Sequence, residues 1–349
     1  MSSVLCKERV QQKAADIGFN RLRVGTVERS VALKHYDRFL SKGYHGTMDW
    51  MVRSRPPRAN IYELLPSAQS IIVVGLDYWH PRPEKPNGLH GKVSCYAWGR
   101  DYHKIITKKL QQLAQSLREC DQGLEAYWTV DSRPVIERGW AEQTGLGFLG
   151  KNTMIISPGE SSFFFLGTLI VNRDLEPDRA ISLNHCGKCT RCLDRCPTNA
   201  FVAPFQMDAR QCISYLTIEY DGIIEPKLAT QMQDWILGCD VCQDVCPHNH
   251  RKWLSKHAEL APRQDHAWVD LQWLLESSET KILDHFAGSP IRRAGIQKLR
   301  RNAVIAWLNQ EGEIPQRWID YLPKESLAFR QWEACQQFEE KNTERGASE

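Results

Sequence analysis

The spacing of the cysteines constrains this chain more than any other feature. The run CGKCTRCLDRCP has gaps of two, two and three residues between Cys186, Cys189, Cys192 and Cys196, and Pro197 follows directly. This is the pattern of bacterial ferredoxins, in which three close thiolates bind one [4Fe–4S] cluster and the fourth cysteine binds the neighbouring cluster. The run therefore predicts two clusters.

A second run, CDVCQDVCP, nearly repeats the first but lacks one cysteine. Cys212, which lies between the runs, is the candidate for the missing ligand. Structural zinc is the alternative, but zinc sites usually pair two short knuckles across a long gap, which fits this spacing less well. The predicted ligands are Cys186, Cys189, Cys192 and Cys246 for the first cluster, and Cys196, Cys212, Cys239 and Cys242 for the second.

The composition predicts an ordinary globular protein. Its apolar and charged fractions, 42% and 25%, are typical. The amino terminus has no apolar run of signal-peptide length and no stretch of eighteen apolar residues occurs, so we expect a cytoplasmic protein without a membrane partner. A net charge of +3 does not by itself indicate a nucleic-acid partner. The remaining cysteines are expected to be small buried residues: Cys6, Cys95, Cys120 and Cys335.

Strands and helices divide the chain into three parts. Apolar runs predict strands in SIIVVGLDYW, LEAYWTV and FFFLGTLIV, and a helix whose apolar face holds Ile106, Leu110, Leu113 and Leu117 lies between the first two. After the cysteine runs no strand is expected, and from Asp270 onward the pattern is helical. We therefore predict a multidomain protein of the α/β or α+β class. Its domains are an α/β domain over 1–178, a ferredoxin-like domain over 179–255 and a helical region over 256–349.

The stretch GLGFLGK, from Gly145 to Lys151, matches G-x-G-x-x-G. A dinucleotide site needs a strand before the glycines and a helix after them. Here the preceding residues are helical in pattern and the following ones extended, so Gly145 is interpreted as a helix C-cap. We expect no Rossmann site.

Asp131 is the candidate catalytic acid. It follows a predicted strand, and α/β sheets build their sites at the carboxyl ends of strands. It could equally cap a helix entered through Pro134, and the residues alone do not separate these roles. Arg138 lies two helical turns further on, so it either faces the same pocket or is a solvated helix charge. Asp101 and His103 supply only half of the D-x-H-x-x-G signature of histidine-ligated cobalamin.

Longer stretches carry a resemblance to a known family. SCYAWGRDYHK, VDSRPVIERGWAEQTGLGFLGKN, SSFFFLGTLIVN and GSPIRRAGIQKLRRNAVIAWLN, with both cysteine runs, resemble epoxyqueuosine reductases from about Arg53 to Leu308. Two details differ from the usual pattern of this family. Phe148 stands where a tryptophan is common, and LLPSAQS replaces the usual LLPGAKS.

The resemblance implies an oxidoreductase that depends on cobalamin and on two [4Fe–4S] clusters. Such an enzyme reduces epoxyqueuosine to queuosine at the wobble position (34) of tRNA, the last step of queuosine biosynthesis. The implied fold has a corrinoid-binding α/β domain, a ferredoxin-like module and HEAT-like helices at the carboxyl end. The implied partners are tRNA and a low-potential electron donor of the ferredoxin or flavodoxin type, and the protein is expected to be a monomer.

The resemblance also suggests roles for individual residues. It implies that Asp131 is the proton donor and that Asp101, His103 and Arg138 lie in the substrate pocket. Asp101 could instead cap a helix, and His103 could be a surface histidine. The segments expected to line the corrinoid contain Arg58, Cys95, Asp131, Leu166, Ser214 and Ile223.

A basic stretch near the carboxyl end has no acidic residue among its cations. SPIRRAGIQKLRRNAVIAW predicts one helix capped by Ser289 with a buried stripe of Ile296, Leu299, Ala303 and Ala306. Charge runs are usually solvated faces, but with the resemblance we expect contacts to tRNA phosphates. The candidates are Arg292, Arg293, Lys298, Arg300 and Arg301.

A protein of another class remains as the alternative. An iron–sulfur electron-transfer protein that reactivates a corrinoid enzyme would need the clusters and a docking face. It would need neither Asp131 nor a basic helix.

Overall fold

The computed structural model describes residues 5–28, 30–181, 184–250 and 253–346. Its largest sheet has four strands in the order β1-β2-β7-β4, and each neighbouring pair is antiparallel. β2, β7 and β4 lie where the apolar runs predict them, but β1 is too mixed in composition to stand out in the sequence. The strands are β1 (Arg21–Thr26), β2 (Ser70–Asp77), β4 (Ala126–Thr129) and β7 (Phe164–Val171).

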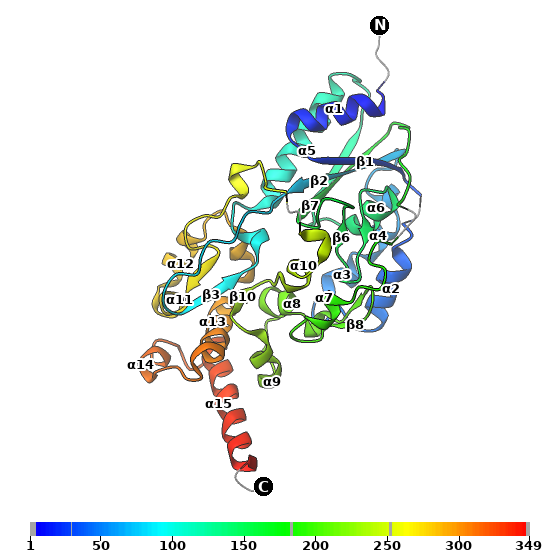
Figure 1. The fold of residues 1–349 in the computed structure, drawn as a ribbon. Helices are drawn as coiled ribbons and strands as arrows, with labels where there is room; N and C mark the ends of the chain where they lie inside the picture. Colours follow the sequence, from blue (N-terminus) through cyan, green and yellow to red (C-terminus); the bar gives the residue numbers. More distant parts are fainter. Residues whose placement is uncertain (1–4, 29, 182–183, 251–252, 347–349) are drawn as a thin grey trace.

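Helices cover both faces of this sheet (Figure 1). Because side chains alternate along a strand, Ile72 and Val74 of β2 join a core shared with helix α5 (Tyr102–Arg118). The predicted apolar face of α5 is wholly buried there, and helix α1 (Lys7–Ile17) packs beside it. The opposite face of β2 packs against helix α6 (Glu137–Gln143).

A second sheet joins the three predicted parts of the chain. β3 (His90–Val93) pairs with β10 (Trp235–Leu237) and with β11 (Trp268–Asp270), so one strand comes from each part. The expectation of no strand after the cysteine runs is therefore wrong. The three residues of β11 are too few to give an alternating pattern, and they form a strand because β3 offers a partner.

The cysteine runs lie on short elements beside the large sheet. α7 (Arg191–Asp194) carries Cys192 and α10 (Val241–Asp244) carries Cys242, and the two helices are in contact. Between them the chain forms the hairpin β8 (Phe201–Ala203)–β9 (Gln206–Met207), α8 (Ile213–Ile218) and α9 (Pro226–Ala229). A cavity lies next to these elements, and three helices line its other side: α2 (Leu33–Ser41), α3 (Asp49–Arg53) and α4 (Arg55–Ala59). The short strands β5 (Phe148–Leu149) and β6 (Ile155–Ile156) form a separate hairpin.

The carboxyl-terminal elements are helical, as predicted. They are α11 (Leu271–Glu276), α12 (Glu279–His285), α13 (Ile296–Glu311), α14 (Gln316–Ile319) and α15 (Leu327–Gly346). The basic stretch is not one helix, because Gly295 adopts a left-handed φ of +77° between a 3₁₀ helix over Pro290–Ala294 and α13. Ser289 caps the 3₁₀ helix, and Leu299, Ala303 and Ala306 are buried as expected. Ile296, the fourth residue of the predicted stripe, is only half-buried.

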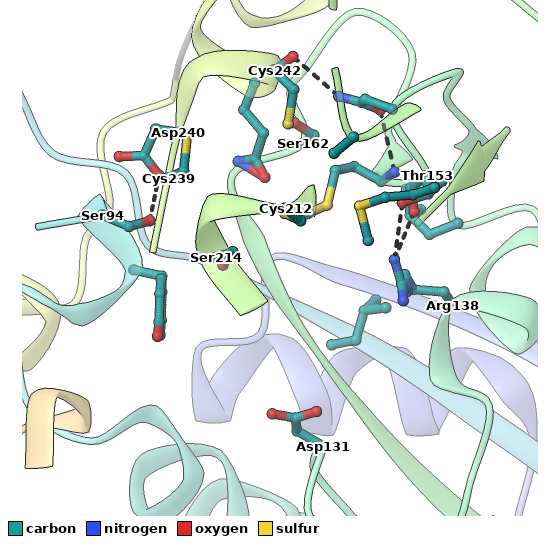
Figure 2. A pocket seen from close by; sticks show the side chains of 18 of the residues that line it. Ser94, Asp131, Arg138, Thr153, Ser162, Cys212, Ser214, Cys239, Asp240 and Cys242 are labelled. Atoms are coloured by element: carbon teal, nitrogen blue, oxygen red, sulfur yellow. Dashed lines mark hydrogen bonds between the residues drawn. The ribbon is translucent and has the colours of Figure 1, made fainter. Parts of the chain in front are cut away.

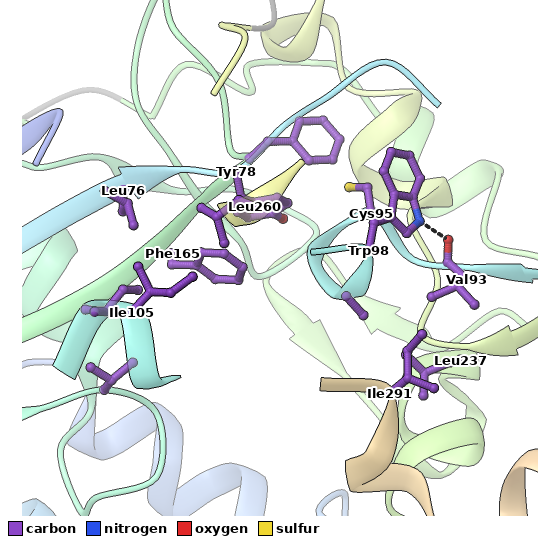
Figure 3. Close-up of a cluster of buried hydrophobic side chains, with 14 of the residues drawn as sticks. Leu76, Tyr78, Val93, Cys95, Trp98, Ile105, Phe165, Leu237, Leu260 and Ile291 are labelled. Carbon is purple, nitrogen blue, oxygen red and sulfur yellow. Dashed lines mark hydrogen bonds between the residues drawn. The ribbon is translucent and has the colours of Figure 1, made fainter. Parts of the chain in front are cut away.

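One hydrophobic core extends through residues of all three predicted parts (Figure 3). Leu76 and Phe165 of the large sheet belong to the same cluster as Leu237 of β10 and Ile291 of the carboxyl-terminal region. The three predicted domains therefore share one hydrophobic core, and their boundaries stay a prediction. In the described ranges, no helix combines the length and apolar character needed to span a bilayer.

Candidate active site

A cavity of about 500 Å³ lies between the large sheet, α6 and the cysteine-bearing helices. Four thiols line one side of it, those of Cys196, Cys212, Cys239 and Cys242. Asp131 lies on another side, with Ser214 of α8 between them in the view of Figure 2. A second cavity of about 510 Å³ shares Tyr36, Trp50, Asp131, Arg138 and Ser214 with the first, so the two are lobes of one space.

The thiols influence one another in the two predicted sets. Burial, followed by the nearby thiols of Cys186, Cys246 and Cys189, raises the pKa of Cys192 to about 11. Burial also raises the pKa of Cys242 well above its ordinary value, with further increases from the second set: Cys239, Cys212 and Cys196. Cys192 adds to the pKa of Cys242 as well, so the two sets are neighbours. These thiols are close enough to affect one another's ionisation, as the ligands of two neighbouring clusters would be.

Within the described ranges, no group of three or more His, Cys, Asp or Glu side chains is arranged to hold a metal ion. A site for a single metal ion and a site for a four-iron cluster differ in geometry. A single zinc ion draws its sulfurs to about 2.3 Å from one centre, whereas the larger four-iron cluster holds its thiolates farther apart. The mutual effects of the thiols on their pKa values support the grouping, and the ligand assignment stays a prediction.

The glycine motif supports the first cysteine loop. Gly145, with φ +75°, ends α6 and its N–H donates to the Glu142 carbonyl, so the C-cap interpretation is confirmed. The helix precedes the glycines and the β5–β6 hairpin follows, which is the reverse of a Rossmann turn. Lys151 Nζ donates to the carbonyls of Gly187 and Cys189 at 2.8 and 2.9 Å. The motif therefore anchors a cysteine loop.

Asp131 does not cap a helix. α6 begins only at Glu137 and has no side-chain cap at its amino terminus. Instead, Asp131 Oδ2 accepts a hydrogen bond from the Tyr102 hydroxyl at 2.6 Å and lies 3.4 Å from Nε2 of His103. Because the large sheet is antiparallel, the strand-end argument from α/β sheets does not apply, although the acid does line a cavity.

His103 holds a proton beside this carboxylate. Its Nδ1 lies 2.8 Å from Oδ1 of Asp101, which also caps α5 by accepting the His103 N–H, so the helix-cap alternative for Asp101 is correct. Burial alone would lower the pKa of His103, but contacts with Asp101 and Asp131 outweigh it and raise the pKa to about 9. The His103 side chain is 22% exposed, so it is half-buried, and neither His103 nor Asp101 is among the residues that line the two cavities.

The same contacts keep Asp131 ionised. Burial alone would raise the pKa of Asp131, but the nearby His103, the hydrogen bond from Tyr102 and the charge of Arg293 lower it to about 2. The Asp131 side chain is 55% exposed because it faces the cavity. The Tyr102 ring stacks between Phe165 and His103, with both centroids 4.0 Å away. Tyr102 was missed from the sequence, where only its position between Asp101 and His103 marks it.

Four of the six residues predicted to contact the corrinoid line the cavity: Arg58, Asp131, Leu166 and Ser214. Cys95 does not line it, because its side chain is buried in the core while its N–H donates to Asp240. Ile223 is 38% exposed and also lies outside the lining. Arg138 lines both lobes, but residues 131–136 are not helical, so two helical turns are not the reason.

The basic stretch separates into exposed and buried cations. Arg292 is exposed, and Arg293 is 45% exposed while paired with Glu219 at 2.7 Å. Lys298 pairs with Asp221 at 2.6 Å. Arg300 donates to backbone carbonyls of Leu274 and Ser277.

Arg301 is wholly buried, and its guanidinium donates to the carbonyls of Tyr220, Gly222 and Leu216. The prediction that Arg301 contacts tRNA phosphate is therefore wrong, because Arg301 lies on the buried face of α13. Among the four other cysteines, Cys95 and Cys335 are buried as expected, Cys120 is half-buried, and Cys6 is exposed.

Family models match two parts of the chain. Residues 58–132 match the family described as epoxyqueuosine reductase QueG, DUF1730. Residues 185–249, which hold all eight predicted ligands, match a 4Fe-4S double cluster binding domain. The chain thus contains this iron–sulfur domain.

Whole-chain relatives agree with the first match. An epoxyqueuosine reductase of Synechocystis is 43% identical over 80% of this chain and 96% of its own length. Those of Pseudomonas aeruginosa and Escherichia coli are 40% and 38% identical, over 86% of this chain and 84% and 80% of their own lengths.

Solved structures show the same fold. An epoxyqueuosine reductase bound to an epoxyqueuosine-modified stem loop of tyrosine tRNA superposes with a TM-score of 0.85 at 30% identity, over 93% of this chain and 87% of that one. A Bacillus subtilis enzyme, solved with the loop of its catalytic aspartate swung out of the active site, gives 0.80 at 31% identity, over 87% and 81% of the two chains. With relatives this similar over nearly their whole length, the chain belongs to the epoxyqueuosine reductase family of oxidoreductases.

Proposed function

We propose that this protein reduces epoxyqueuosine to queuosine at the wobble position of tRNA. The observation that carries the proposal is one cavity lined on one side by predicted cluster thiols and on another by a carboxylate hydrogen-bonded to Tyr102 and close to a charged histidine. Converting an epoxide to an alkene and water consumes two electrons and two protons. The cavity walls offer a source for each.

The position of the cavity supports cobalamin as its ligand. Its two connected lobes, of about 500 and 510 Å³, offer room for a large ligand, and the second cluster's thiols form part of the wall. Arg58, Leu166 and Ser214 would contact it there. Bound cobalamin supplies a low-potential cobalt centre for reducing the substrate. The clusters would deliver single electrons from a ferredoxin- or flavodoxin-type donor.

The protein's own acid–base groups supply the protons. An alkoxide left on the opened epoxide needs a proton, and a positioned acid typically contributes 10²–10⁴-fold to such a step. Asp131 faces the cavity, but its pKa of about 2 leaves it ionised before substrate binds. His103, with a pKa of about 9, holds the proton behind it. In this proposal Asp131 delivers to the substrate oxygen a proton that His103 supplies.

The tRNA would approach past the carboxyl-terminal region. Arg293 lies close enough for its charge to lower the pKa of Asp131, so a phosphate bound by Arg293 and Arg292 would stand near the cavity. HEAT-like packing of the helices after Asp270 is part of the proposal, as are the three domains and a monomeric state. The alternative, an electron-transfer protein, leaves the Asp131 side of the cavity without a role.

The direct test uses the holoenzyme. Reconstituted protein is incubated with cobalamin, a strong reductant and tRNA containing epoxyqueuosine, and nucleosides are analysed by mass spectrometry. We expect queuosine to appear only with tRNA, reductant and cobalamin together. A protein that carries full clusters and bound cobalamin yet leaves epoxyqueuosine intact would support the electron-transfer alternative.

A further inference from the structure

The loop that presents Asp131 is held in an unusual backbone conformation. Asp131 has a left-handed φ of +48°, which residues with a side chain rarely adopt unless surrounding contacts fix it. The loop connects β4 to α6, and Asp131, Ser132 and Arg133 at its tip are exposed. Asp adopts this conformation more readily than most residues, so the contacts that the loop makes with its surroundings decide how firmly it is held.

A single carboxyl oxygen makes that contact. Glu137 Oε1 accepts the backbone N–H of Asp131 at 2.6 Å, and it lies 3.5 Å from the Thr129 hydroxyl at the end of β4. The oxygen thus lies against the start of the loop, where β4 ends and the acid follows. We propose that Glu137 is a positioning residue that holds the Asp131 loop against Tyr102 and His103, an inference that rests on the role proposed above for Asp131.

Glu137 is well placed for this role because its helix is rigid. Trp140 and Ala141, on the same helix, are buried in the core under the sheet. Arg58 adds a second tie, donating from Nη1 to the Val135 carbonyl at 2.6 Å. The loop is therefore fastened at its start through Glu137 and near its end through Arg58.

The charge state of Glu137 agrees with this arrangement. Burial, and then the negative charge of Asp131, raise the pKa of Glu137 to about 8. At neutral pH a protonated Glu137 can still accept the N–H of Asp131 without repelling its carboxylate. The B. subtilis relative with its aspartate loop swung out shows that such a loop moves in that protein.

Two substitutions separate the hydrogen bond from the charge. Glu137→Gln keeps an oxygen acceptor and is expected to leave turnover within about threefold of normal, whereas Glu137→Ala should lower kcat at least about tenfold with little change in KM for tRNA. Iron content and the absorption of bound cobalamin should be unchanged in both. Gln143→Ala is the matched control, because Gln143 lies on the same helix, outside the cavity, and makes one side-chain contact, to the Val31 N–H.

Hydrogen exchange measures the loop without relying on activity. Amides of residues 130–136 should exchange faster in Glu137→Ala than in Glu137→Gln or Gln143→Ala. Normal exchange and normal kcat in Glu137→Ala would overturn the proposal. If even the unaltered protein failed to convert tRNA, the proposed function would fail, while the exchange data would still decide whether Glu137 holds the loop.

A double-mutant cycle isolates the route of the effect. If Glu137 acts through Asp131, Glu137→Ala added to Asp131→Ala should cost less than about twofold further in kcat, because residues that act as a unit are not additive. An equal loss in both backgrounds would show that Glu137 supports the fold and has no specific link to the acid.

Discussion

The two sides of the cavity are built in opposite ways. The electron side comes from one segment of 65 residues, 185–249, whose buried thiols raise one another's pKa. The proton side joins α5 to the loop after β4, and its groups differ in charge: an ionised Asp131 beside a protonated His103. The difference teaches that most cluster ligands are set by spacing within one short segment, whereas the acid needs the folded sheet to bring its partners together.

Removing one thiol from the electron side should have the largest effect. Cys212→Ala should lower iron from about eight to about four per chain, as two four-iron clusters require, and abolish turnover, since the second cluster lines the cavity. Iron assay and absorption spectra of protein purified without oxygen measure this.

Cys120→Ala is its control, because this half-buried thiol lies outside both runs. Unchanged iron in Cys212→Ala would mean that another group completes the second cluster.

On the proton side, Asp131→Asn should leave both clusters in place. It removes the charge but keeps the size, so the fold should persist, with loss of the part of the stabilisation that comes from the contact with protonated His103. Turnover should fall at least about a hundredfold, the lower end of the range for a positioned acid. Single-turnover conversion of epoxyqueuosine with cobalamin and tRNA bound is the measurement. Near-normal conversion would transfer the donor role to His103 or to a bound water.

The contrast also explains what the sequence could reveal. Cysteine spacing predicted the iron–sulfur domain, because ligands that lie a few residues apart can be recognised in the sequence without knowing how the chain packs. The apolar face of α5 and three strands of the large sheet were likewise encoded locally. β1 was missed because its composition is mixed, and β11 because three residues are too few to show a pattern, so both depend on the strands that they pair with.

The site residues show the same division. Asp131 and Arg138 were identified through the resemblance, and both line the cavity. Tyr102 and Glu137 were missed, since their importance lies in hydrogen bonds that exist only after folding. Arg301 was misassigned because a run of cations does not show which one the helix turns inward.

A change of pH should affect the proton side alone. The contacts that raise the pKa of His103 from 6.5 to about 9 stabilise the fold fully below pH 6.5, and this stabilisation is lost as pH rises through about 9. Turnover that depends on protonated His103 should fall over the same upper range. Asp101→Asn can still cap α5 but loses its charge, so the fall should move to lower pH, giving a several-fold loss near pH 8.5. A pH–rate profile at saturating tRNA measures this, and identical profiles would remove His103 from the proton route.

The smallest effect should come from outside the cavity, where the exposed and buried cations of the basic stretch can be compared. Arg292→Glu with Arg293→Glu should weaken tRNA binding and reduce the salt slope by about 0.7–0.9 for each phosphate that the protein no longer neutralises, because fewer counterions are released. Arg301→Met should leave that slope unchanged but lower the melting temperature, because it strands the carbonyls that the buried guanidinium satisfies, at about 1–3 kcal/mol for each. Filter binding across a salt series and thermal melts of both variants provide the comparison. An unaltered slope in the Arg292 and Arg293 variant would make these cations an ordinary solvated surface and place the tRNA on another face of the protein.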